Sequence, residues 1–97
     1  MPDKHRSVVE SMHYQRERDA LIPHPVLADA ALEQITTLLA QSPEIGQPTN
    51  RPDILAITTE DTPVLPAAVL YYAYDDQTVV LLSIVKADPL AWLDWFR

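Results

Sequence analysis

The sequence predicts an α+β fold, in which a helical hairpin packs on a small antiparallel β-sheet and a short C-terminal helical tail follows. Three observations support this prediction. Apolar residues recur at spacings of three and four before residue 42, two runs rich in Val, Leu and Tyr come after it, and an acidic turn separates those runs. Helices that precede strands, rather than alternating with them, are typical of α+β proteins. A chain of 97 residues should form one domain over residues 1–97.

Composition and charge restrict the function. The net charge is −7, and four of the seven basic residues fall within residues 1–19, so the remainder of the chain is strongly acidic. Such a surface repels nucleic acid, whose binding depends on Lys and Arg replacing condensed counterions. The absence of cysteine excludes disulfides and thiolate metal sites. No apolar run reaches the ~20 residues that cross a bilayer, and the N-terminus lacks a signal-peptide core, so we expect a cytoplasmic protein without membrane contact.

The N-terminal segment, residues 1–22, is expected to be helical over residues 5–21. The side chains that would form its inner side are Val8, Val9, Met12 and Arg16. This apolar stripe is thin, so the helix should pack one narrow face on its neighbours. Pro23 and Pro25 then interrupt the chain, because proline lacks the backbone donor and restrains the preceding residue.

The main helix is expected over residues 26–42. Its apolar residues lie at helical spacing and form a wide stripe: Ala28, Ala31, Leu32, Ile35, Leu38 and Leu39. Pro43 disfavours helical geometry at the residue before it, so the helix should end near Gln41 or Ser42. Gly46 is the only glycine in the chain. We expect it to adopt a positive φ and to reverse the chain beneath the helix end.

Residues 53–86 should form the sheet. The proline-flanked segment 53–61 predicts a short strand at an edge. Residues 67–74 and 78–85 predict a β-hairpin, because they are rich in β-branched and aromatic residues and are joined by an Asp-Asp-Gln turn. Both faces of this hairpin are largely apolar, so it should lie centrally and be covered by the helices.

Two sets of side chains on the last strand are candidates for packing on the main helix. They are Val79, Leu81 and Val85, or the opposite-face set Val80, Leu82 and Ile84. The tail, residues 88–97, places Trp92, Trp95 and Phe96 together at helical spacing. These three aromatic side chains either complete the core or bind a partner protein.

Two motifs resemble the RelE/ParE superfamily of toxins from bacterial type II toxin–antitoxin systems. They are the leucine-rich helix end LLAQSPEIGQP and the hairpin VLYYAYDDQTVVLLSIVK, and the resemblance covers roughly residues 26–88. It implies a helical hairpin on a small antiparallel sheet and a role in plasmid stabilization. It also implies a cognate antitoxin that wraps the chain, and a cellular target such as DNA gyrase or the ribosome. A homodimer is left open.

Two features differ from that family. Its members usually open with a strand before the first helix, and residues 1–15 offer no convincing strand. The ribonucleases of the family carry several Lys and Arg residues across the sheet, whereas this chain offers Lys86 and Arg51. The resemblance therefore favours contact with a protein over cleavage of RNA.

Metal-free RNA cleavage needs a base, an acid and cations around the phosphate. The candidate catalytic residues are Tyr72, Tyr74, Lys86 and Arg51. Tyr72 and Tyr74 share one face of their strand, although each could equally fill the core. Lys86 could be a solvated strand end, and Arg51 could cap a turn. The three histidines are too dispersed to form a ligand set, so no metal and no cofactor are expected.

Three functions remain open. The first is a toxin that acts through protein–protein contact and is neutralised by an antitoxin. The second is a ribosome-dependent mRNA endonuclease of the same superfamily. The third is a non-toxic interaction or regulatory module that shares the fold.

Overall fold

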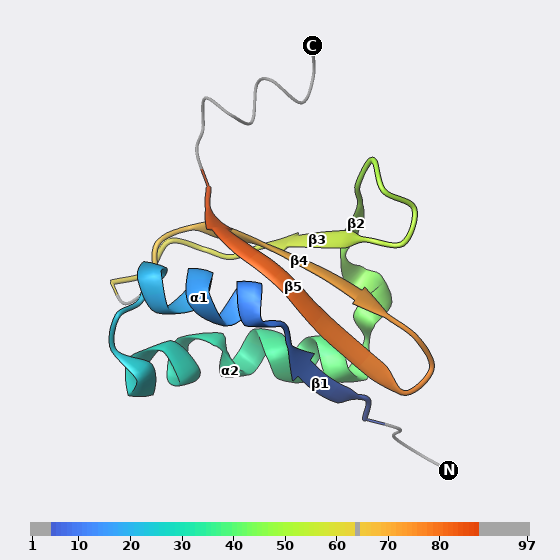
Figure 1. Ribbon diagram of the computed structural model, residues 1–97, viewed down its shortest axis with the longest axis horizontal. Helices are drawn as coiled ribbons and strands as arrows, with labels where there is room; N and C mark the ends of the chain where they lie inside the picture. The colour runs from blue at the N-terminus through green and yellow to red at the C-terminus, as the bar shows by residue number, and fades with distance from the viewer. Residues whose placement is uncertain (1–4, 64, 88–97) are drawn as a thin grey trace.

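The computed structural model of the protein describes residues 5–63 and 65–87. In that part of the chain, two α-helices lie on one face of a five-stranded sheet with the strand order β1-β5-β4-β3-β2 (Figure 1). The predicted α+β class is confirmed, and the predicted tail over residues 88–97 lies outside the described residues. The elements are β1 (Ser7–Glu10), α1 (Met12–Leu21), α2 (Pro25–Gln41), the 3₁₀ turn η1 (Pro43–Ile45), β2 (Gln47–Pro48), β3 (Leu55–Thr58), β4 (Ala68–Tyr74) and β5 (Thr78–Lys86).

The first described element is a strand, so the helix predicted over residues 5–21 is wrong in its first part. β1 runs parallel to β5 and pairs Val8 with Val79. The helix begins only after Ser11, whose hydroxyl accepts a hydrogen bond from the backbone N–H of Tyr14 at 3.0 Å and caps α1. The backbone N–H of Ser11 donates to Leu81 at 3.0 Å and continues the pairing to the helix start. Val8 and Val9, which are β-branched, suit this strand better than a thin helical stripe.

Helix α2 agrees closely with the prediction. It starts with Pro25, where the missing N–H costs no intrahelical bond, and it ends at Gln41, where Pro43 was expected to stop it. The buried side chains on its inner face are Ala28, Leu32, Leu39 and Ala40. Leu38, which the predicted stripe included, is 43% exposed on the outer side of the helix.

The hairpin of β4 and β5 is confirmed, but one extra residue changes which side chains face the helices. Tyr71 pairs with Ser83 and Tyr72 pairs with Leu81, so Leu82 is left over as a β-bulge. The buried residues of β5 are therefore Val79, Leu81 and Ile84. This is neither of the two predicted sets, because the bulge shifts the alternation of side chains between Leu81 and Ile84.

Strand β3 lies one place in from the edge of the sheet. It pairs with β4 on one side and with the two-residue strand β2 on the other. The predicted edge position of residues 53–61 is thus nearly correct, because β2 covers only a short part of β3.

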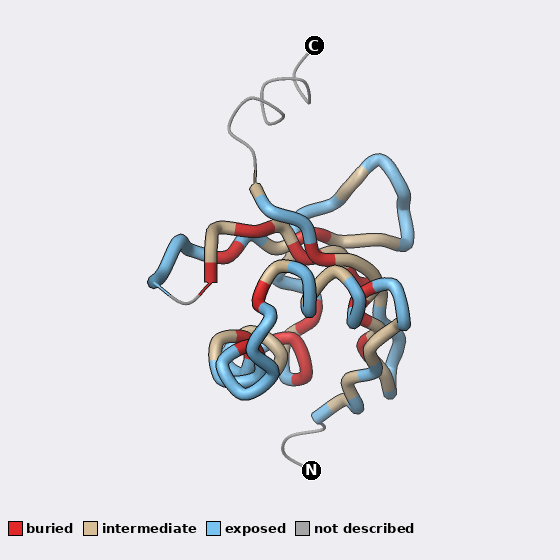
Figure 2. The backbone as a smooth tube through the Cα atoms, turned by 60° about the vertical axis from the view of Figure 1, so that its left-hand side comes forward, coloured by how far each residue is buried: buried red, intermediate tan, exposed pale blue. Residues whose placement is uncertain are grey.

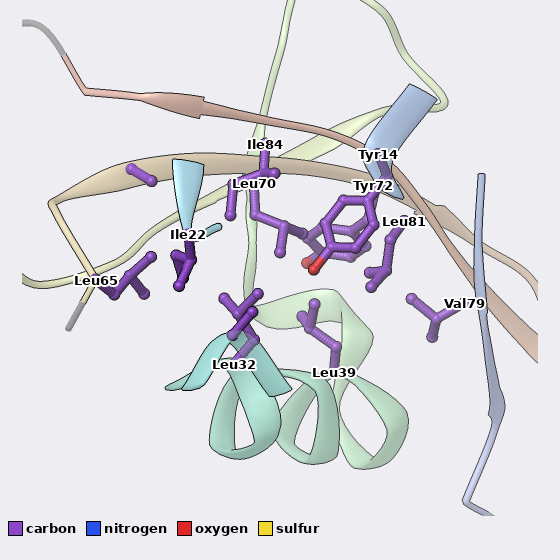
Figure 3. Close-up of a cluster of buried hydrophobic side chains, with 12 residues drawn as sticks. Tyr14, Ile22, Leu32, Leu39, Leu65, Leu70, Tyr72, Val79, Leu81 and Ile84 are labelled. Carbon is purple, nitrogen blue, oxygen red and sulfur yellow. The ribbon is translucent and has the colours of Figure 1, made fainter. Parts of the chain in front are cut away.

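The core forms between the sheet and the two helices (Figure 3). Tyr14 of α1, Leu32 and Leu39 of α2, and Leu70 and Tyr72 of β4 are fully or almost fully buried. Buried segments lie where the sheet meets the helices, and exposed segments lie on the outer turns (Figure 2). The hairpin was expected to lie centrally and to be covered by the helices. Its strands β4 and β5 do lie inside the sheet, and in the described residues α1 and α2 cover one of its two faces.

Helix α1 also protects the edge of β5 beyond the end of β1. Glu17 accepts hydrogen bonds from the Ser83 hydroxyl at 2.5 Å and from the backbone N–H of Ile84 at 3.1 Å. An unpaired strand edge invites pairing with another chain. The carboxylate of Glu17 takes the place of a neighbouring strand at this point.

Because of the bulge, the two adjacent leucines of β5 differ in burial: Leu81 is fully buried and Leu82 is half-buried. Leu81→Ala should lower the free energy of unfolding by about 2–5 kcal/mol, because the side chain is fully buried. Leu82→Ala should cost clearly less, because Leu82 is half-buried. Urea denaturation of both variants tests the difference, and an equal or larger cost for Leu82→Ala would contradict the bulge.

Candidate functional site

Tyr72, predicted as a catalytic candidate, is buried and its hydroxyl is already bonded to the backbone. The hydroxyl donates to the carbonyl oxygen of Pro43 at 2.5 Å and accepts from the N–H of Gly46 at 2.9 Å. Burial raises the pKa of Tyr72, and the hydrogen bond from Gly46 opposes that rise. The side chain therefore joins the middle of β4 to the turn after α2 and has no free path to a substrate.

The same contact explains the position of the single glycine. Gly46 has a φ of −67° and a ψ of 166°, so the predicted positive φ is wrong. A Cβ at this position would lie 2.9 Å from Cζ of Tyr72 and would collide with its hydroxyl oxygen. Glycine is required because the tyrosine approaches the backbone closely, not because the backbone turns left-handed.

Tyr74 lies near the turn end of β4, where it is 40% exposed. The guanidinium of Arg6 lies 5.6 Å from the centre of its ring, within range of a cation–π contact. Arg6 also donates to the carbonyl oxygen of Asp75 at 2.7 Å. Asp75 in turn accepts from the backbone N–H groups of Gln77 and Thr78, which lower its pKa. Tyr74 and Arg6 thus form part of an ordered turn.

The four predicted catalytic residues do not meet at one place. Lys86 is exposed at the far end of β5, where it pairs with Ala68. Tyr74 lies six residues further along β4 from Ala68, which is about 20 Å for an extended strand. Arg51 is exposed in the loop between β2 and β3. The predicted partner-binding residues Trp92, Trp95 and Phe96 lie outside the described residues.

The sheet face opposite the helices is apolar, and we call it the open face. Its side chains alternate along each strand with those of the core, and cross-strand partners share a side. The apolar side chains of the open face are Val9 on β1, Ala56 on β3, Val69, Tyr71 and Ala73 on β4, and Val80 and Val85 on β5; the register places Ser7, Thr58 and Thr78 on the same side, at its margins. Val9 is 49% exposed and Val85 is 38% exposed. Neither described helix covers this surface, which gives it the character of a protein-binding site.

A second feature is a cavity of about 490 Å³ where β1, α1 and α2 meet, which we call the polar cleft. Among its lining residues are Glu10, Tyr14, Arg18, Asp29, Leu32 and Glu33. Arg18 donates to both carboxylate oxygens of Glu10, at 2.8 and 2.9 Å. Its guanidinium also lies 5.8 Å from the centre of the Tyr14 ring.

The hydroxyl of Tyr14 is buried and has no hydrogen-bond partner among the described residues. Burial is the main cause that raises the pKa of Tyr14 to about 12, and the charge of Glu10 adds to the rise. The phenol is therefore neutral at physiological pH.

Sequence reasoning missed the polar cleft. Glu10 and Arg18 are eight positions apart, which fits no helical pair of three or four residues. They meet because a strand ends and a helix begins between them, at Ser11. If residues 5–21 formed one continuous helix, as the sequence predicted, Glu10 and Arg18 would not be expected to form this contact. A serine immediately before a helix-forming run is the N-cap signal that could have separated the two elements.

Two other features, a metal site and a membrane-spanning helix, are not found in the described residues. No group of three or more His, Asp or Glu side chains within residues 5–63 and 65–87 is placed to hold a metal ion. In the same part of the chain, no helix has the length and apolar character needed to cross a membrane.

Comparison with solved structures identifies the class of fold. The chain superposes on a structure of the chromosomal ParDE TA system from P. aeruginosa with a TM-score of 0.67, at 17% identity, covering 88% of this chain and 99% of that one. It superposes on a structure of the toxin–antitoxin complex RelBE2 from Mycobacterium tuberculosis with a TM-score of 0.65, at 24% identity, covering 88% and 97%. The chain shares the fold of these two structures, which is the fold that the resemblance of its two motifs implied. Comparisons with protein-family models and with curated protein sequences found no match.

The contact between Gly46 and Tyr72 can be tested by a double-mutant cycle. Gly46→Ala should destabilise the protein by about 1–3 kcal/mol, because the new methyl group displaces the tyrosine hydroxyl. Tyr72→Phe should cost a similar amount, because it leaves the groups at Pro43 and Gly46 unpaired. The double variant should cost less than the sum in urea denaturation. Additive losses would show that the two residues do not interact.

The buried phenol of Tyr14 predicts a loss of stability at alkaline pH. Its pKa rises from the ordinary 10.0 to about 12 on folding, so its contribution is fully present below pH 10. Between pH 10 and 12 the unfolded chain loses this proton first, and stability falls by at most about 1.4 kcal/mol per pH unit. Tyr14→Phe should lack this part of the loss in urea denaturation at pH 9, 10 and 11, with Tyr71→Phe as the matched control. An unchanged pH profile in Tyr14→Phe would contradict the prediction.

Proposed function

We propose that this chain is the toxin component of a type II toxin–antitoxin system, that it acts through protein–protein contact, and that a cognate antitoxin neutralises it. The observation that carries the proposal is the match in fold to two solved toxin–antitoxin assemblies, over 88% of this chain and nearly all of each matched chain. The proposal includes a cytoplasmic location and a role in plasmid stabilization.

The open face supports a protein partner. It presents a continuous set of Val, Ala and Tyr side chains that neither described helix covers. Covering such a surface removes apolar area from water, which is the dominant favourable contribution to most protein association. Tyr71 lies among the valines, and tyrosine is frequent at the centres of binding interfaces. Trp92, Trp95 and Phe96 remain further candidates for the same role.

The distribution of charge favours a protein target, such as DNA gyrase, over RNA. The net charge is −7. Among the described cations, Arg18 is paired with Glu10, and the Arg6 Nε–H donates to the carbonyl oxygen of Asp75. Arg16, Arg51 and Lys86 are exposed, which is a small number of cations for binding a phosphate backbone. The hydroxyl of Tyr72 is bonded to the chain itself. These contacts argue against an mRNA endonuclease that uses Tyr72, Tyr74, Lys86 and Arg51.

The open face gives a direct mutational test of the partner. Val9→Glu and Val85→Glu should each weaken the complex with the product of the adjacent gene by tenfold or more, because a buried unpaired carboxylate is costly. Val26→Glu is the matched control, because Val26 is 70% exposed on α2 and lies off the open face. Co-expression and size-exclusion chromatography measure the complex, and a growth assay measures toxicity of the chain alone.

Three outcomes would redirect the assignment. If the chain alone is soluble, monomeric and harmless, and no neighbouring gene product co-elutes with it, the toxin proposal fails and a regulatory module replaces it. Tight RNA binding with a steep dependence on salt would favour the endonuclease. A homodimer that the open-face variants disrupt would show that a second copy of this chain, not an antitoxin, covers the face.

A further inference from the structure

The polar cleft carries an excess of negative charge. Its lining includes the carboxylates of Glu10, Asp29 and Glu33 and the single guanidinium of Arg18. Because Arg18 binds both oxygens of Glu10, those two charges offset each other. Asp29 and Glu33 lie one turn apart on α2, and both are exposed. Neither has an ion-pair partner within residues 5–63 and 65–87.

Tyr14 supplies a second, independent indication of a ligand. Its side chain is fully buried and borders the cleft, yet its hydroxyl has no partner among the described residues. The guanidinium of Arg18, which also lines the cleft, lies 5.8 Å from the centre of the Tyr14 ring. A buried polar group without a partner costs about 1–3 kcal/mol, so native proteins rarely keep one without a reason.

We propose that the polar cleft binds an organic cation, namely an ammonium or guanidinium group carried on an aliphatic stem. The N–H groups of the cation would donate to the carboxylates of Asp29 and Glu33. The stem would contact Leu32, which lines the same cavity. The Tyr14 hydroxyl would lie at the inner end, where an oxygen lone pair can accept a further hydrogen bond.

The volume and the lining residues of the polar cleft suit an organic cation better than a metal ion. A volume of about 490 Å³ lies in the range of small-molecule pockets and far exceeds that of one ion. Among the described residues, no cluster of carboxylates and imidazoles is placed to hold a metal. The cleft also mixes charged and apolar walls, as an amine with a hydrocarbon stem requires. The inference does not depend on the proposed toxin role.

The same chemistry has two sources, a free alkyl amine or guanidine and a basic side chain of a partner peptide. Three probes separate them when each is titrated into the full chain: n-butylammonium, n-butylguanidinium and the peptide acetyl-Gly-Gly-Arg-Gly-Gly-amide. Binding is followed by amide chemical shifts in NMR. Saturable shifts at Tyr14, Asp29 and Glu33 are expected. Preference for the small cations assigns a free ligand, and preference for the peptide assigns a partner's side chain.

Paired variants control for general electrostatics. Asp29→Asn with Glu33→Gln should weaken binding by about tenfold, because charge-assisted hydrogen bonds are lost. Asp53→Asn with Glu60→Gln changes the net charge equally at exposed positions that do not line the cleft, and it should leave binding unchanged. Equal weakening by both pairs, no saturable shift with any probe, or identical shifts with neutral n-butanol would each overturn the proposal.

Discussion

The contact between the hydroxyl of Tyr72 and the turn after α2 is the interaction on which the arrangement of helices and sheet most depends. One oxygen atom bonds to the carbonyl of Pro43 and to the N–H of Gly46, and so joins the centre of the sheet to the end of the main helix. The proline ends the helix, and the glycine leaves room for the phenol. The tyrosine satisfies backbone groups that would otherwise be buried without partners. Three residue types that are ordinary by themselves thereby determine the direction in which the chain leaves the helix and enters β2.

Placing both helices on one face of the sheet determines where partners can bind. The described part of the chain buries one side of β4 and β5 well, and the other side remains apolar without a helix over it. The charges also favour a protein partner, because Arg6 and Arg18, which lie near the β1 edge of the sheet, both bond to other groups of the protein. A surface that is apolar and poor in free cations suits another protein better than a nucleic acid. The polar cleft lies among β1, α1 and α2, so the molecule presents two chemically different surfaces.

Elements dominated by local signals were predictable, and elements that depend on distant pairing were not. The spacing of Leu32, Ile35 and Leu39 identified α2, and an acidic turn between two β-branched runs identified the hairpin. β1 has four residues and acquires its strand conformation from β5, so its own sequence gave only a weak indication. The bulge at Leu82 has no sequence marker, and it decided which side chains of β5 face inward. The polar cleft could not be predicted either, because Glu10 approaches Arg18 only when a strand precedes the helix, and that strand depends on pairing with β5.

The parallel pairing of β1 with β5 has a consequence for synthesis of the chain. Ser11 bonds to Leu82 across 71 positions, so the first strand to leave the ribosome pairs with the last strand of the described sheet. Contacts of such high contact order form late, because the loop between them must close before any stabilisation is gained. Helix α2 can form during translation, whereas β1 and the β4–β5 hairpin both lack their partner strand until β5 has emerged. The native sheet is therefore completed only after β5 has been made, and a chain truncated before β5 lacks the central strand that joins β1 to β4.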